Sequence, residues 1–239
     1  MAKKEVVFHS NVYHLSYELI NPHQSQTLLI LHGWGSNKEI MKQAFAKTFP
    51  QYTHLYLDLP GFGHSSVNDV INTAMYANIV ECFLKALHVK PSIIIGHSFG
   101  GKVATLLHPP MLVLLSSAGI VIPKPLKVRA KIALFKLFKP FFPKKFYRLF
   151  ATKDVEGMSE TMYGILKCVV NEDFSQFFAN TTAKTVIFWG KEDRATPQSS
   201  GEKIHSLIPN SLFYALEGDH FFFLKNAQKI EKLILESMD

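Results

Sequence analysis

Cysteine is scarce in this sequence. Only Cys82 and Cys168 occur in 239 residues, and they lie far apart in the chain. Neither belongs to a C-x-x-C pair or to a cluster of histidines and cysteines, which are the patterns of disulfide-rich domains and structural zinc sites. The sequence therefore predicts no disulfide framework and no metal site, and we expect both cysteines to be small buried hydrophobic residues.

Long uncharged apolar runs are also absent. No stretch reaches the roughly 18 apolar residues that a membrane-spanning helix needs, and residues 1–9 lack the apolar core of a signal peptide. We therefore expect a cytoplasmic protein. The length, with 47% hydrophobic and 19% charged residues, is typical of one compact domain with a large core.

Acidic side chains are missing from one segment, Lys124 to Lys153, which holds ten of the 26 lysines and arginines. The remaining 16 cations are outnumbered by the 19 acidic residues, so this segment alone makes the protein basic, with a net charge of +7. Charge concentrated in this way predicts a local anionic partner and argues against a general nucleic-acid-binding surface.

Short apolar runs alternate with helical segments along most of the chain, a pattern typical of a mainly parallel, doubly wound α/β sheet. Residues 123–184 break the alternation, because they are rich in phenylalanine and interrupted by prolines. We predict a helical lid there, inserted into one core formed by residues 1–122 and 185–239. Strands are predicted at residues 6–8, 12–19, 27–31, 54–57, 92–95, 111–115, 185–189 and 211–216, and helices at residues 39–48, 73–87, 99–107, 197–208 and 227–236.

A serine motif follows the predicted strand 92–95. Residues 96–101 read Gly-His-Ser-Phe-Gly-Gly, which matches the Gly-x-Ser-x-Gly pattern of a nucleophile elbow. Small residues allow the sharp turn that raises the serine hydroxyl above the sheet. A structural glycine-rich turn is the alternative, but the strand before the motif and the helix after it favour catalysis. We predict Ser98 as the nucleophile, the N–H of Phe99 as an oxyanion donor, and His97 as a residue that shapes the elbow.

A second glycine loop follows the first central strand and reads His32-Gly33-Trp34-Gly35-Ser36. A loop at this position can aim the backbone N–H of Trp34 at the same oxyanion. The alternative is a simple turn between a strand and a helix. The sequence therefore predicts an oxyanion hole formed by Trp34 and Phe99.

The serine needs a general base, because a hydroxyl is a weak nucleophile at its free pKa. In this type of fold the partners follow later strands, in the chain order serine, acid, histidine. Asp193 follows the predicted strand 185–189 and is the candidate acid, with its neighbour Glu192 as the alternative to test.

His220 is the candidate base among the 11 histidines. It combines a late strand end, a nearby glycine and the expected chain order, whereas the others suit surface, packing or turn positions. By the same chain order Asp58, which precedes the nucleophile, is predicted to tie its own loop by hydrogen bonds. Asp219, next to His220, is predicted to face another direction.

These motifs together resemble the α/β-hydrolase family with a lid. The resemblance implies a cofactor-free acyl-enzyme mechanism, with the roles given above for Ser98, Asp193 and His220. The serine at the elbow argues against the dehalogenase and epoxide-hydrolase branches, which have aspartate at this position. The matching segments are residues 32–36, 58–65, 96–101, 189–197 and 218–220.

Within the family, residues 32–35 and 58–63 look most like pimeloyl-acyl-carrier-protein methyl ester esterases. Those enzymes meet an acidic carrier protein through a basic lid, and the resemblance implies that task for the segment from Lys124 to Lys153. The chain departs from them at His97, where those esterases usually have tryptophan.

Other functions stay open. Meta-cleavage-product hydrolases, which split a carbon–carbon bond of a 2-hydroxy-6-oxo-dienoate, share the frame but typically carry asparagine at the position of His97 and tryptophan at that of Phe221. A small aliphatic ester is a third possibility, and a catalytically inactive binding protein on a hydrolase frame a fourth. The basic segment could also lie on an anionic surface or form a solvated face.

Overall fold

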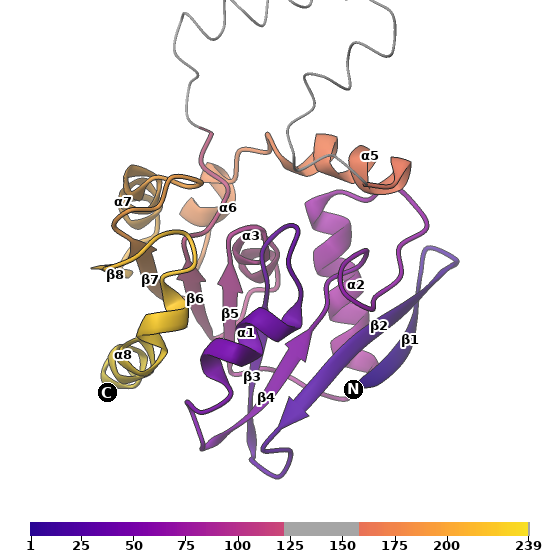
Figure 1. Ribbon diagram of the computed structural model, residues 1–239, viewed down its shortest axis with the longest axis horizontal. Coiled ribbons are helices and arrows are strands. Elements are labelled where there is room, and N and C mark those ends of the chain that lie inside the picture. Colours follow the sequence, from indigo (N-terminus) through magenta and orange to yellow (C-terminus); the bar gives the residue numbers. More distant parts are fainter. Residues whose placement is uncertain (122–157, 239) are drawn as a thin grey trace, which may run out of the picture.

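A computed structural model of the protein describes residues 1–121 and 158–238. Its centre is an eight-stranded sheet with the order β1-β2-β4-β3-β5-β6-β7-β8 (Figure 1). β1 and β2 form an antiparallel hairpin, β2 pairs antiparallel with β4, and the other neighbours are parallel. The strands are β1 (Ala2–Phe8), β2 (Asn11–Ile20), β3 (Gln26–Leu31), β4 (Tyr52–Leu57), β5 (Ile93–His97), β6 (Met111–Leu115), β7 (Lys184–Gly190) and β8 (Leu212–Leu216).

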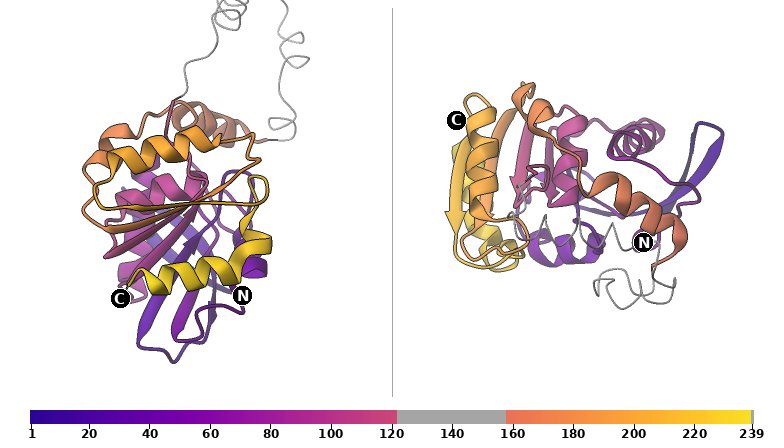
Figure 2. Two further views of the ribbon diagram at one scale, coloured as in Figure 1. Left: turned by 90° about the vertical axis from the view of Figure 1, so that its left-hand side faces the viewer. Right: turned by 90° about the horizontal axis from the view of Figure 1, so that it is seen from above.

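Helices cover both faces of the sheet (Figure 2). α1 and α8 pack on one face, and α2, α3 and α7 on the other, so each face has its own hydrophobic cluster. The predicted doubly wound, mainly parallel sheet is confirmed. The helices are α1 (Lys38–Phe45), α2 (Thr73–Ala86), α3 (Phe99–Leu106), α5 (Glu160–Val169), α6 (Ser175–Ala179), α7 (Gln198–Leu207) and α8 (Phe223–Glu236).

The central strands show why the apolar runs predicted the sheet. Every residue of β5 and β6 is buried, as expected for parallel strands covered by helices on both faces. In contrast, the outer strand β1 is mostly exposed, and among the described strands it pairs only with β2.

Several details differ from the sequence-based expectations. β1 begins at Ala2 instead of residue 6, and α1 ends at Phe45 instead of residue 48. α8 begins at Phe223 instead of residue 227, and no capping side chain marks its start, because Phe222 and Phe223 are held by burial in the core. Cys168 is exposed and Cys82 is only partly buried, so the prediction that both are buried is wrong. Cys168 lies on α5, on which only Ile165 and Val169 are buried.

α5 and α6 lie between β6 and β7 in the chain and extend over the edge of the sheet where the parallel strands end (Figure 1). Lys102 of α3 fastens this segment. Its buried ammonium donates to the carbonyl oxygen of Val169 and to Glu172, both at 2.7 Å, and lies 4.5 Å from the centre of the Phe174 ring. The division into a core and a lid at residues 123–184 stays a prediction, because residues 122–157, with the whole basic segment, lie outside the described residues.

A buried ion pair ties α1 to the end of β4. The ammonium of Lys38 lies 2.7 Å from Asp58 Oδ2, and the two side chains are 1% and 0% exposed. Asp58 also accepts hydrogen bonds from the backbone N–H groups of Lys38 and His64, which agrees with the loop-tying role predicted from the sequence. Burial raises the pKa of Asp58, but these hydrogen bonds and the Lys38 charge outweigh it and bring the pKa below its ordinary value.

We expect Asp58→Asn to lower the free energy of unfolding by about 3–5 kcal/mol, because it leaves the Lys38 charge buried and unpaired. Urea unfolding at neutral pH measures the loss. Since the folded-state pKa of Asp58 lies below its unfolded value, this stabilisation is present at neutral pH and disappears as the pH falls through the folded-state pKa.

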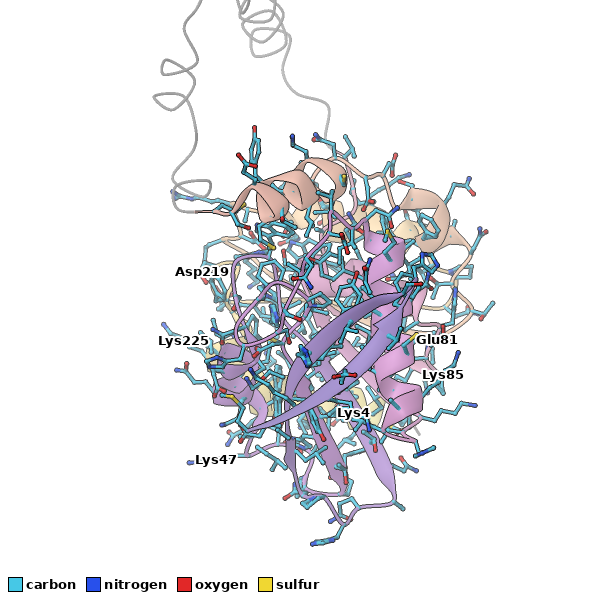
Figure 3. The ribbon with its side chains drawn as sticks, turned by 90° about the vertical axis from the view of Figure 1, so that its right-hand side faces the viewer. Lys4, Lys47, Glu81, Lys85, Asp219 and Lys225 are labelled. Carbon is cyan, nitrogen blue, oxygen red and sulfur yellow. The ribbon has the colours of Figure 1, made fainter. Side chains whose placement is uncertain are left out.

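The control is Glu81→Gln. Glu81 pairs with Lys85 one turn away on the exposed face of α2, where both side chains project into solvent (Figure 3). Its loss should change the unfolding free energy by less than about 1 kcal/mol. Equal urea midpoints for Asp58→Asn and the native protein would contradict the structural role of the buried pair.

Candidate active site

Ser98 occupies a strained turn between β5 and α3. Its φ of 49° and ψ of −114° lie in a region that a residue with a side chain rarely adopts. The turn is held from three sides: the Ser98 N–H donates to the carbonyl oxygen of Leu115, and the Ser98 carbonyl accepts from the N–H groups of Gly101 and Ala118, each at 3.0 Å. Strain of this kind persists where surrounding contacts impose it, and it is common at functional sites.

Glycines on either side of Ser98 allow the close packing that the turn requires. A Cβ atom at Gly96 would lie 2.4 Å from the carbonyl oxygen of Gly100, and one at Gly100 would lie 2.5 Å from that of His32. A Cβ at Gly33 would lie 3.1 Å from the Cβ of Ser98. The loop after β3 therefore lies directly against the turn after β5.

The N–H groups of Trp34 and Phe99 are the predicted oxyanion donors. Phe99 is the first residue of α3, so its N–H has no partner within the helix. The rings of the two residues pack edge to face, with centres 5.6 Å apart. In the part of the chain that the structure describes, neither N–H donates a hydrogen bond.

The side chain of His32 fixes the loop that carries Trp34. Its Nε2 accepts from the N–H of Leu59 at 3.0 Å, and its Nδ1 donates to the carbonyl oxygen of Gly33 at 2.8 Å. Burial lowers the pKa of His32 to about 4, so the ring is neutral at physiological pH. His32 therefore acts as a fixed structural link between the loops after β3 and β4.

Asp193 and His220, from the loops after β7 and β8, are in direct contact. Nδ1 of His220 lies 2.7 Å from Asp193 Oδ2, and the Asp193 side chain is fully buried. The N–H groups of Ala195 and Thr196 donate to Oδ1, and the Thr196 hydroxyl donates to Oδ2. Burial raises the pKa of Asp193, but the hydrogen bonds from His220 and Thr196 outweigh it and bring the pKa to about 2.

The neighbouring carboxylates are engaged elsewhere. Glu192 accepts from the N–H of Gly218, and Asp219 accepts from the N–H of Phe221, both at 2.9 Å. Neither carboxylate bonds to the His220 ring within the described ranges. Of the two acids considered from the sequence, Asp193 is therefore the one that the structure brings to His220.

His97 links the segment of His220 to the turn that carries Ser98. Its Nε2 lies 3.0 Å from the carbonyl oxygen of His220, and the centres of the two rings are 4.6 Å apart. No hydrogen bond joins Ser98 Oγ to His220 among residues 1–121 and 158–238. Hydrogen bonds between a nucleophile and its base are often long without substrate. The structure brings Asp193 and His220 into direct contact, and it places His97, the chain neighbour of Ser98, against His220.

Sequence reasoning missed two contacts at this site. It assigned His97 to the elbow alone and did not single out Thr196, whose hydroxyl lies 2.9 Å from Asp193 Oδ2 and 3.3 Å from His220 Nδ1. The position of Thr196, three residues after Asp193, was an available signal, because such residues commonly cap an aspartate turn. Nothing in the sequence indicated that His97 would reach the backbone of residue 220.

Across the described residues, no group of three histidine, cysteine or acidic side chains is arranged to hold a metal ion. None of the described helices is long and apolar enough to cross a membrane.

Comparisons with known proteins show which sequences and folds the chain resembles. Residues 26–109 match the family described as the alpha/beta hydrolase fold. The chain is 27% identical to the uncharacterized hydrolase YugF of Bacillus subtilis over 86% of both chains. It is 40% identical to the pimeloyl-[acyl-carrier protein] methyl ester esterase of Shewanella woodyi, over 34% of this chain and 30% of that protein, so this match spans less than a third of the esterase.

A solved structure extends the likeness to the whole fold. An esterase from Exiguobacterium antarcticum superposes with a TM-score of 0.76 at 20% identity and full coverage of both chains. This likeness concerns the fold, whereas the matches above concern the sequence. Together with the observed sheet, these matches show the α/β-hydrolase fold and a similarity in sequence to hydrolases.

Proposed function

We propose that the protein is a serine hydrolase of the carboxylesterase type, which cleaves a carboxylic ester through an acyl-enzyme. The observation that carries this proposal is the 2.7 Å contact between Asp193 and Nδ1 of His220, beside a serine held in a strained turn. An acid, an imidazole and an elbow serine are the parts of a Ser-His-Asp triad.

The tautomer of His220 follows from its contact with Asp193. The ionised carboxylate is an acceptor only, so Nδ1 of His220 carries the hydrogen and donates it. The lone pair of the neutral ring is then on Nε2, where it can take the proton of Ser98. Because the pKa of Asp193 is about 2, this carboxylate stays ionised and stabilises the imidazolium that forms.

In the proposed reaction, Ser98 Oγ attacks the ester carbonyl carbon while its proton moves to His220. The carbonyl oxygen becomes an oxyanion, which the N–H groups of Trp34 and Phe99 stabilise. As the tetrahedral intermediate collapses, the carbon–oxygen bond to the alcohol breaks and His220 gives its proton to the departing oxygen. His220 then takes a proton from water, whose oxygen attacks the acyl carbon. As the bond between that carbon and Ser98 Oγ breaks, His220 returns the proton to Oγ, and the acid is released.

The substrate class rests on the relatives. The relatives named pimeloyl-[acyl-carrier protein] methyl ester esterases support the proposal that the substrate is an ester of a small alcohol, either free or borne on a carrier protein. The cations from Lys124 to Lys153 complement an acidic carrier or another anionic surface. We propose that this segment belongs to a lid at residues 123–184 and meets such a partner.

We expect Ser98→Ala to lower the turnover of p-nitrophenyl esters by about 10⁴- to 10⁶-fold, because it removes the attacking oxygen. Hydrolysis of p-nitrophenyl esters from acetate to decanoate shows which acyl length the native protein prefers. A Ser98→Ala protein that keeps most of its activity would refute the assignment. A native protein that is silent on every ester would favour carbon–carbon hydrolysis or a binding role.

Asp193→Asn should lower kcat by about 10⁴-fold, because an amide neither stabilises the imidazolium nor fixes the His220 tautomer. Its matched control is Glu192→Gln, which changes the adjacent carboxylate that bonds to the Gly218 N–H. Steady-state kinetics on the preferred ester compare the two. If Glu192→Gln were the more damaging variant, the acid would have to be reassigned.

Reversing two charges tests the proposed partner. We expect the double variant Lys144→Glu, Lys145→Glu to lower kcat/KM at low salt toward a methyl ester borne on acyl carrier protein, because it weakens attraction to an acidic surface. Its kcat/KM toward a p-nitrophenyl ester of the same chain length should stay near that of the native protein. Equal behaviour of the variant and the native protein on the carrier-borne ester would count against carrier docking.

A further inference from the structure

The side chain of His97 lies where three loops of the candidate site meet. Its Nε2 is 3.0 Å from the carbonyl oxygen of His220, and its Nδ1 would be 2.9 Å from a Cβ atom placed on Gly33. In the chain it directly precedes Ser98. One buried ring therefore contacts the loops of the nucleophile, the base and the predicted oxyanion donor.

The contact with His220 defines the hydrogen positions of the His97 ring. A carbonyl oxygen only accepts, so Nε2 of His97 carries the hydrogen and donates it. Burial, reinforced by the neighbouring His220, lowers the pKa of His97 to about 3, so the ring is neutral over the range in which a histidine base works. The opposite nitrogen, Nδ1, is buried and has no hydrogen-bond partner among the described residues. His97 thus has one polar contact to lose.

The segment that carries His220 is a turn between β8 and α8, and Gly218 within it has a φ of 122°. Glu192 holds Gly218 through two hydrogen bonds, and Asp193 holds the imidazole ring of His220. His97 contacts the backbone of residue 220 itself, and its ring also packs against Phe221 and Phe223, at centre distances of 5.4 and 4.8 Å.

We propose that His97 is a positioning residue that sets the separation of Ser98 Oγ and His220 Nε2 by donating its Nε2 hydrogen to the His220 carbonyl. This inference rests on the serine-hydrolase function proposed above. His97 connects the proposed base with the proposed nucleophile, because its side chain contacts His220 and it directly precedes Ser98 in the chain. A displacement of about 1 Å between reacting groups can cost about 10²-fold in rate.

Three variants of His97 separate this role from simple packing. His97→Phe keeps a ring but loses the donor, whereas His97→Gln places an amide donor near the position of Nε2. We expect His97→Phe to lower kcat on the preferred p-nitrophenyl ester by about 10²-fold with KM changed less than about threefold, because positioning acts on the chemical step. His97→Gln should recover kcat to within about tenfold of the native value. His97→Asn, whose shorter amide falls short of the carbonyl, should resemble His97→Phe and gives a polar comparison if the phenylalanine variant does not fold.

A second measurement asks whether His97 acts through His220. In a His220→Ala background, His97→Phe should cause no further loss of the residual Ser98-dependent hydrolysis, since the positioned group is already gone. Equal losses of kcat in His97→Gln and His97→Asn, native kcat in His97→Phe, or an undiminished effect in the His220→Ala background would each overturn the proposal. Hydrolysis by the native protein that does not require Ser98 would instead remove the proposed function, and the role of His97 with it.

Discussion

The parallel arrangement of β3, β5, β7 and β8 is the constraint on which the candidate site depends. Parallel strands end at the same edge of a sheet, so residues far apart in the chain meet there without any long excursion of the backbone. Trp34, Ser98, Asp193 and His220 each follow one of these strands. The hydrophobic clusters on the two faces of the sheet therefore stabilise the geometry of the candidate site as well as the fold.

Buried polar contacts then fix the loops that the strands bring together. Lys38 and Asp58 hold the loop after β4, and the His32 ring connects it to the loop after β3. Lys102, one turn into the helix that follows the serine, holds the segment of α5 and α6 against α3. These groups are desolvated and fully engaged, so each loop has one arrangement that satisfies them. A rigid site of this kind suits a mechanism in which hydrogen-bond donors are in place before charge develops.

Much of this could be predicted from the sequence, because its signals are local. Continuous apolar runs indicated the buried strands, and the glycines around Ser98 indicated a turn that only small neighbours allow. Asp193 and His220 were identified by their positions after late strands. The start of α8 was missed because burial of Phe222 and Phe223 sets it without a capping residue. The contact of His97 with His220 joins residues 123 positions apart, and no local pattern encodes it. The exposure of Cys168 depends on which face of α5 packs against the core. The sequence of this short helix did not indicate that face.

Covalent labelling of the native protein by a fluorophosphonate, followed by mapping of the modified peptide, tests the central claim most directly. We expect the label to be on Ser98 and labelling to become far slower in His220→Ala, because the imidazole is needed to remove the serine proton. Labelling at another residue, or equal rates in the native protein and His220→Ala, would contradict this claim.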